Sequence, residues 1–311
     1  MNPSSGQHAP AGESPASPTR VRTALITIQV LFGFNYLASK VIVTAMSPGA
    51  WAALRTLGAF VVLALLAVIG RRRLPAGRDI LLLAVCALFG VIFNQGFFLE
   101  GLSRTTVGRS ALICSQIPTF VLLFALIARQ EVLTRRKALG FVAGIVGVLV
   151  LLEVDRFTLD SQYLVGDLLT LTNAASYGLF VVISRRVMAR NDPLAATATV
   201  FFFGAAGMMV YGGGSLLATD AAILDARLVG TMIYVIIGAT VVTYFLNLWA
   251  IKRVQATRVA LYIFLQPVIA ALLGVTVRGE DLTPRFILSM VLVFTALALR
   301  DSPQKPPPLD E

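Results

Sequence analysis

Three charged residues fall inside long apolar stretches of the chain, where an ionised side chain is costly unless it faces protein or water. Lys40, Arg55 and Glu100 lie at similar distances from the same predicted end of their stretches. We expect them to line a vestibule there, where two cations and one acid favour a ligand that carries a carboxylate. The alternative is that each long side chain reaches the lipid headgroups independently.

A second set of polar residues is uncharged and lies nearer the middle of the apolar stretches. Its members are Asn35, Tyr36, Asn94, Gln95, Gln116, Asn173, Tyr177, Tyr244, Asn247, Tyr262 and Gln266. Amides both donate and accept hydrogen bonds, so the set suits a polar cavity for a zwitterion or a neutral solute. Hydrogen bonds between helices are the simpler alternative for any single member. Pro118 and Pro267 interrupt helical hydrogen bonding and are candidate hinges.

The elements that must position these side chains are membrane-spanning helices. Hydrophobic residues make up 57% of the 311 residues and charged residues 14%, against roughly 25% charged in a soluble domain. Runs of about 20 apolar residues predict membrane spans. We place ten, at 24–45, 50–70, 80–102, 107–128, 137–153, 166–184, 195–218, 228–250, 257–277 and 285–300. Short loops leave no room for a soluble catalytic domain.

The chain also repeats itself. A shift of 149 residues lays 104–142 over 253–291 without a gap, and 13 of 39 positions coincide, including Glu-x-Leu-Thr-x-Arg at Glu131 and Glu280. Chance similarity in an apolar chain is the alternative, but the matches include charges and a proline. A shift of 145 aligns Gly33, Ser39 and Pro48 with their mates in the second half. We therefore expect a duplication.

The basic residues predict the orientation. With the N-terminus in the cytoplasm, 18 of the 26 lysines and arginines lie inside and 6 outside, which favours both termini inside. Five spans per half then make the second half enter from the opposite side. Such an inverted repeat is typical of secondary transporters with alternating access. The net charge of +10 therefore reflects topology and attraction to a lipid bilayer, and we expect no nucleic-acid partner.

These residues carry a resemblance to a known family. Thr105, Ala111, Pro118 and Glu131, followed by glycines at 140, 144 and 147, are similar to the drug/metabolite transporter (DMT) superfamily, EamA family. Pro267, Glu280 and Leu282 repeat the pattern in the second half, but Ser289 and Ala296 replace two of the glycines. The resemblance implies an all-α bundle of two five-helix EamA repeats, at 24–153 and 166–300, that moves small metabolites, often outward.

The remaining features are simpler. Residues 1–22 and 301–311 are predicted to be cytoplasmic tails, the first of them disordered. Cys86 and Cys114 read as free buried thiols, and the single histidine, His8, lies in a tail, so we expect no metal site and no cofactor. Glu131 is expected to pair with a neighbouring arginine, and Thr134 to cap the fifth span.

The sequence therefore predicts a multi-pass bacterial inner-membrane exporter of small metabolites, such as amino acids or related carboxylates. Paired intramembrane Asp or His residues, which a membrane enzyme would be expected to show, are missing from the sequence. A structural membrane protein or a lipid scramblase is the remaining alternative. Phosphate-cradling motifs are also missing, so exchange or proton coupling, with Glu100 or Asp167 as the acid, stays open, as does the oligomeric state.

Overall fold

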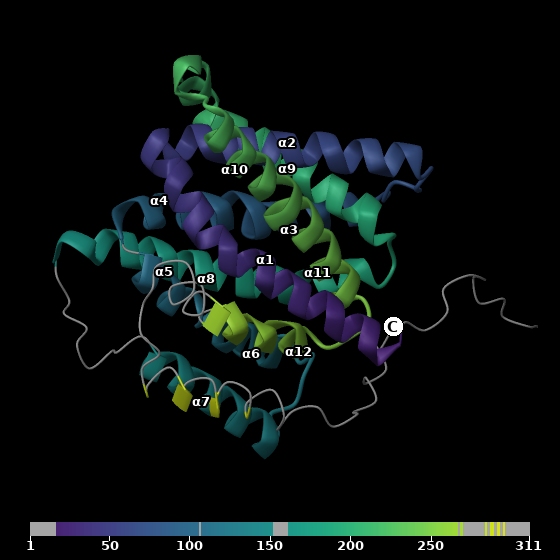
Figure 1. Cartoon of the computed structure of the whole chain (residues 1–311). Coiled ribbons are helices and arrows are strands. Elements are labelled where there is room, and N and C mark those ends of the chain that lie inside the picture. Colours follow the sequence, from purple (N-terminus) through teal and green to yellow (C-terminus); the bar gives the residue numbers. More distant parts are fainter. Residues whose placement is uncertain are drawn as a thin grey trace, which may run out of the picture.

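The chain folds into a helical bundle (Figure 1). The computed structural model describes residues 17–105, 107–151, 161–266 and 268–269, and residues 284, 287, 288, 291, 292 and 295. All regular elements within these residues are helical, and the same residues contain no strand. Pro267, and with it that half of the predicted hinge pair, lies outside the described residues, as do the tails 1–16 and 296–311.

The described residues of the first half form seven α-helices. They are α1 (Pro18–Ala45), α2 (Pro48–Ile69), α3 (Arg78–Ala87), α4 (Asn94–Arg104), α5 (Val107–Cys114), α6 (Ile117–Ile127) and α7 (Arg135–Leu151). A π-helical turn, η1 (Leu88–Phe93), joins α3 to α4, so that Arg78–Arg104 is one continuous rod.

The second half follows the same pattern. It contains α8 (Ser161–Met188), α9 (Pro193–Leu217), α10 (Ala226–Ile236), α11 (Thr243–Ile251) and α12 (Ala256–Leu261). A π-helical turn, η4 (Ile237–Val242), joins α10 to α11, and 3-10 turns occupy Ala221–Ile223 (η3) and Tyr262–Phe264 (η5). Thus η1 and η4 are 149 residues apart, the displacement that aligns the two halves of the sequence.

Six of the described helices are long and apolar enough to cross a membrane. They are Pro18–Ala45, Pro48–Ile69, Arg78–Arg104, Leu164–Met188, Pro193–Leu217 and Ala226–Ile251. The predicted fourth span is divided at Ser115–Gln116 into α5 and α6, because Pro118 occupies the first turn of α6 and lacks the N–H that a continuous helix needs there. The fifth span is α7, with 17 residues. The second part of the predicted ninth span and most of the tenth lie outside the described residues.

The predicted N-terminal tail is too long by several residues. Helix α1 begins at Pro18, inside the 1–22 segment, because Ser17 accepts a hydrogen bond from the Arg20 amide at 3.3 Å and the proline sits in the first turn. Both features favour a helix start.

Among the described helices, α2 and α9 share the most extensive contact. A Cβ atom on Gly212, near the end of α9, would lie 1.9 Å from the carbonyl oxygen of Gly49, at the start of α2. Only glycine permits this approach. Since the start of one helix meets the end of the other, α2 and α9 are antiparallel (Figure 1).

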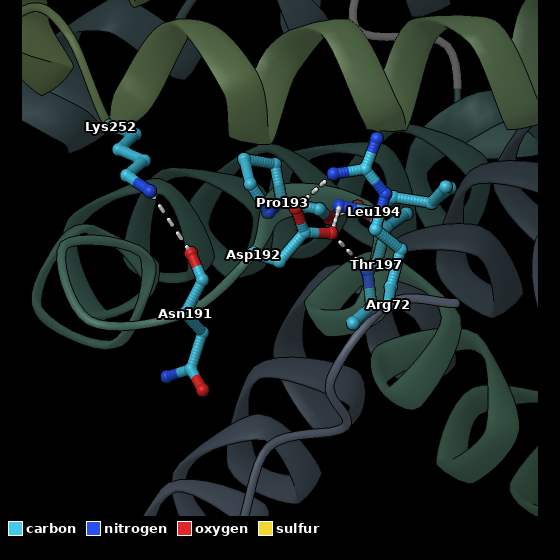
Figure 2. Close-up of polar contacts among 8 residues, drawn as sticks. Arg72, Asn191, Asp192, Pro193, Leu194, Thr197 and Lys252 are labelled. Carbon is cyan, nitrogen blue, oxygen red and sulfur yellow. Dashed lines mark hydrogen bonds and ion pairs between the residues drawn. The ribbon is translucent and has the colours of Figure 1, made fainter. Parts of the chain in front are cut away.

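One end of the bundle is rich in cations, and we call it the basic end. It comprises the start of α1, the α2–α3 loop (70–77), the α8–α9 loop (189–192) and the α11–α12 loop (252–255) (Figure 1). Polar contacts tie these loops together (Figure 2): Arg72 pairs with Asp192 at 3.3 Å, and Lys252 donates to the Asn191 carbonyl at 3.3 Å. Arg190 also pairs with Asp79 at 2.9 Å. At the opposite end, α4 and α8 are joined by a 2.8 Å hydrogen bond from Thr105 to Asp167.

Candidate functional site

A narrow polar cavity lies between the two halves of the bundle. Its volume is about 60 Å³, room for only a few waters at ~30 Å³ each. Its polar wall consists of Gln29, Asn35, Tyr36, Arg55, Asn94, Gln95, Asn173, Tyr177, Tyr244, Asn247 and Gln266, with the thiol of Cys114. Apolar side chains fill the rest, among them Phe32, Phe98 and Ile263. Such a mixture of apolar wall and convergent polar groups is typical of small-molecule sites.

Arg55 is the one charged residue among the described residues that form the wall of this cavity. Its side chain comes from α2 and the residue is only 1% exposed. The guanidinium donates from Nε to the Thr240 hydroxyl at 2.7 Å and from Nη2 to the Ala239 carbonyl at 3.3 Å. The third nitrogen, Nη1, is buried without a hydrogen-bond acceptor among the described residues. A buried cation without a counter-ion is strongly unfavourable, so this site is suited to an anion.

The two π-helical turns are held by side chains from opposite halves. The Ala239 carbonyl of η4 accepts from Arg55 of the first half, while the Gly90 carbonyl of η1 accepts from the Tyr244 hydroxyl of the second half at 2.6 Å. Gly90 and Ala239 are 149 residues apart, so the two acceptor carbonyls occupy equivalent positions in the two copies, although their donors do not. Single π-turns within α-helices are frequent at functional sites. Here both turns bind side chains that line the cavity.

Tyr244 is the centre of a polar network on one wall. Its hydroxyl accepts from the Gln95 amide at 3.1 Å and lies 3.0 Å from the Asn94 side-chain oxygen. The Asn94 amide donates to Asn173, whose own amide lies 3.7 Å from the Cys114 sulfur. Because a tyrosine hydroxyl has a single proton, it donates either to Gly90 or to Asn94 at one time. The network therefore has a hydrogen-bonding position that can change partners.

A second set of hydrogen bonds lines the same cavity. The Tyr36 hydroxyl donates to the Gln266 oxygen at 3.2 Å, and the Gln266 amide donates to Gln29 at 2.7 Å. Nearby, the Asn247 amide donates to the Tyr177 hydroxyl. The bonds of Tyr36 and Gln29 connect α1 with Gln266, which follows η5, and the bond of Asn247 connects α11 with α8. Each bond therefore joins elements that are far apart in the sequence.

Ten of the fourteen residues predicted for the site line this cavity, and four do not. The four outside it are Lys40, Glu100, Gln116 and Tyr262. Gln116 lies in the turn between α5 and α6, where it accepts from Thr119 at 3.5 Å, and Tyr262 is buried in η5.

The expected cluster of Lys40, Arg55 and Glu100 is not formed. The Lys40 ammonium binds the carbonyls of Leu102 and Thr105 at 2.8 and 3.1 Å. Carbonyls at a helix end lack partners within the helix and attract a cation. Glu100 instead contacts Arg104 and the Tyr211 hydroxyl. Arg104 is four residues along the same helix, a favourable spacing for an ion pair.

Glu131 forms an ion pair with Lys137. The Glu131 carboxylate lies 2.9 Å from the Lys137 ammonium, and both side chains are nearly fully buried. Lys137 follows Arg135 and Arg136 on α7 and faces the bundle interior. The expected pair with a neighbouring arginine stays a prediction. Thr134 does accept from the Lys137 amide, at 3.3 Å, which is the expected cap of α7.

The sequence interpretation missed two polar contributors. Gln29 lines the cavity two helical turns before Tyr36, a spacing that places both on one face of α1. Thr240 positions Arg55 from inside η4. Gln29 could have been predicted by extending the polar face of α1 toward its N-terminus. Nothing in the local sequence signals a π-turn at Thr240.

Comparisons with known proteins agree with this architecture. The family model described as the EamA-like transporter family matches residues 23–153 and again 164–300. The Uncharacterized transporter YoaV of Bacillus subtilis (strain 168) is 23% identical over 88% of this chain and 94% of its own. A chloroplastic WAT1-related protein of Arabidopsis thaliana is 27% identical over 91% of this chain and 69% of its own.

One solved crystal structure of a protein has the same fold. It aligns with a TM-score of 0.74 at 19% identity, covering 93% of this chain and 97% of that chain. With two matches to one family model and a bundle of apolar helices, the chain is a multi-pass membrane protein that belongs to the EamA-like transporter family of the drug/metabolite transporter superfamily.

Proposed function

We propose that this protein is a secondary transporter, working outward, for small metabolites that carry a carboxylate, such as amino acids. The observation that carries the proposal is Arg55, a buried guanidinium at the cavity with one nitrogen unpartnered among the described residues. A carboxylate oxygen accepting from Nη1 would supply the missing charge and hydrogen bond. The surrounding amides and phenols suit the ammonium, hydroxyl or amide groups of the same solute.

The size of the cavity favours a conformation that closes around a small solute. A cavity volume of about 60 Å³ is small for a metabolite. Polar contacts also join neighbouring segments at both ends of the bundle. Transport by alternating access requires such a closed form between two open ones. We assign the described conformation to this stage.

We further propose that the two halves, 24–153 and 166–300, are inverted repeats of five spans each. Helix α9 is the sequence mate of α2 at a shift of 145, and the two pack antiparallel. The contacts also exchange between the halves: α1 packs on α11, and its mate α8 packs on α4. The π-turns η1 and η4 also occupy equivalent positions in the two halves. The excess of cations at the basic end supports an inner-membrane protein with both termini cytoplasmic.

Reconstituted vesicles test the function directly. The protein is reconstituted into phospholipid vesicles that are loaded with one unlabelled amino acid or other carboxylate. Uptake of the same solute in labelled form is then measured, and the measurement is repeated across a panel of solutes. We expect accumulation of at least one carboxylate and none of its amide or ester analogue. An imposed pH gradient in the same vesicles separates proton coupling from exchange.

Arg55→Leu is the decisive variant. We expect it to insert into the membrane and to lose transport, with Arg55→Lys retaining a small fraction because lysine keeps the charge without the forked geometry. Arg186→Leu, which removes an exposed arginine at the end of α8, is the matched control and should transport normally. Normal transport by Arg55→Leu would contradict the assignment. Scrambling of labelled phospholipid without any solute uptake would instead favour a lipid scramblase.

A further inference from the structure

A groove on the outer face of the bundle carries a separate site. It runs between α2, α3 and α9 near the basic end and has a volume of about 630 Å³, within the ~300–1,000 Å³ range of ligand pockets. Its walls are apolar, with Phe60 and Ala64 from α2 and Phe202 from α9, and its mouth carries Arg71 and Arg72. We propose that this groove binds one anionic phospholipid, with an acyl chain between α2 and α9 and the phosphate at Arg71.

The charge at the mouth fits an anionic headgroup. Arg71, Arg72 and Arg73 are consecutive and exposed, directly after the end of α2. Arg72 points toward the start of α9, where it pairs with Asp192 (Figure 2). The Arg71 side chain makes no hydrogen bond or ion pair within the part of the chain that the structure describes. Its guanidinium is thus uncommitted, and no carboxylate is found among the described residues that line the groove.

The backbone at Arg71 points to the same role. Its φ of 47° lies in the left-handed region, and its amide and that of Arg72 bind the Val68 and Ala67 carbonyls at 3.0 and 2.9 Å. This closing pattern of a helix normally places glycine at the left-handed position. An arginine there is conformationally unfavourable, although Gly70 is its neighbour. Among the described residues only Arg71 and Arg129 hold a non-glycine side chain on such an unfavourable backbone, which is a reason to infer a function for the side chain.

Binding of two defined lipids tests the proposal. The purified full-length protein in mild detergent is titrated with dioleoylphosphatidylglycerol or dioleoylphosphatidylcholine, and retained lipid is counted by native mass spectrometry. We expect one phosphatidylglycerol to be retained in preference to phosphatidylcholine. Arg71→Gly should reduce its affinity about fivefold, since one cation near an anionic headgroup contributes ~1 kcal/mol.

Replacing Arg71 by glycine separates an effect on lipid binding from an effect on folding. Because glycine suits the left-handed backbone, Arg71→Gly should keep or raise the unfolding temperature in detergent alone while losing the lipid preference. Arg73→Gln removes the same charge from the same loop without lining the groove and should bind lipid normally. Ala64→Phe fills the groove and should abolish retention, whereas Leu65→Phe, on an exposed position beside it, should not.

Four results would each overturn the proposal. They are equal retention of the two lipids, equal loss in Arg71→Gly and Arg73→Gln, undiminished binding by Ala64→Phe, and retention of glycerol phosphate as tight as that of the whole lipid. A mass corresponding to a dimer that Ala64→Phe dissociates would overturn it too, because the groove would then be an interface between two copies. None of these variants changes the polar cavity, so transport by them is independent of this test.

Discussion

At the scale of single residues, the polar wall depends on Tyr244 as well as on Arg55. Replacing Tyr244 by Phe leaves the Gly90 carbonyl and the Gln95 amide without the hydroxyl that binds them. We expect a loss of about 1 kcal/mol in stability, in line with buried hydrogen bonds in membrane proteins, and a loss of transport. Thermal unfolding in detergent and vesicle uptake measure the two effects.

Tyr234→Phe is the matched control for this variant. Its hydroxyl also binds a buried carbonyl, that of Leu31 at 2.7 Å, but Tyr234 does not line the cavity. The same loss of stability with normal transport is expected. If both variants transport equally, the Tyr244 network serves folding alone.

Cys114 offers a chemical test of cavity occupancy. Its thiol lines the cavity near Asn173, whereas Cys86 is buried in α3 away from it. In the Cys86→Ala variant, a small membrane-permeant thiol reagent should label Cys114 and inhibit transport, and a transported carboxylate should slow the labelling. Cys114→Ala, which keeps Cys86, should resist inhibition. Labelling of Cys114 that no substrate slows would argue against binding in this cavity.

At the scale of helices, the antiparallel contact between α2 and α9 depends on a missing side chain. Gly212→Ala would place a Cβ atom 1.9 Å from the Gly49 carbonyl, so the helices must separate. We expect a destabilisation of at least the ~1–3 kcal/mol typical of overpacking. Gly214→Ala, two residues along α9 with nothing within 4 Å, should be neutral. The melting temperatures of the two variants in detergent give the comparison.

The division of the fourth span shows what helix patterns in the sequence can predict. Pro118 is visible in the sequence and correctly locates an interruption of the helix. The π-turns at Leu88–Phe93 and Ile237–Val242 have no such signal, because their residues are ordinary apolar ones. They are fixed by tertiary hydrogen bonds from Arg55 and Tyr244, which a sequence does not display.

At the scale of the whole molecule, the polar contacts at the basic end are suited to opening. Arg72 and Asp192 have side chains 50% and 24% exposed, and exposed ion pairs contribute only ~0–1 kcal/mol each. They can therefore separate at little cost. Cysteines at positions 72 and 192, in a Cys86→Ala and Cys114→Ala background, joined by a reducible bifunctional reagent, should stop transport until reduction.

Single-cysteine variants treated in the same way are the control for that experiment and should keep their activity. Transport at the full rate with the link intact would show that this end of the bundle does not need to open.

Much of the polar wall of the cavity was predictable because intramembrane polarity is expensive and therefore informative. Ten predicted residues, including Asn35, Gln95 and Gln266, meet at one cavity. The predicted depth of a residue along its helix was a poorer guide to its place in the cavity wall than the side of the helix on which the residue lies. Lys40 and Glu100 are predicted at the level of Arg55, but Lys40 binds the carbonyls that end α4 and Glu100 binds the arginine one turn away.

Arg55 is the one charged residue among the described residues that line the cavity, and this has an electrical consequence for the proposed transport. A guanidinium stays protonated under all physiological conditions, so a bound monoanion would neutralise the charge that the empty cavity carries. The membrane voltage acts on a whole charge with ~2.3 kcal/mol per 100 mV if the charge crosses the full field. If the proposed cycle moves Arg55 through the field, voltage should change the rate at which the empty protein returns and have little effect on the loaded step.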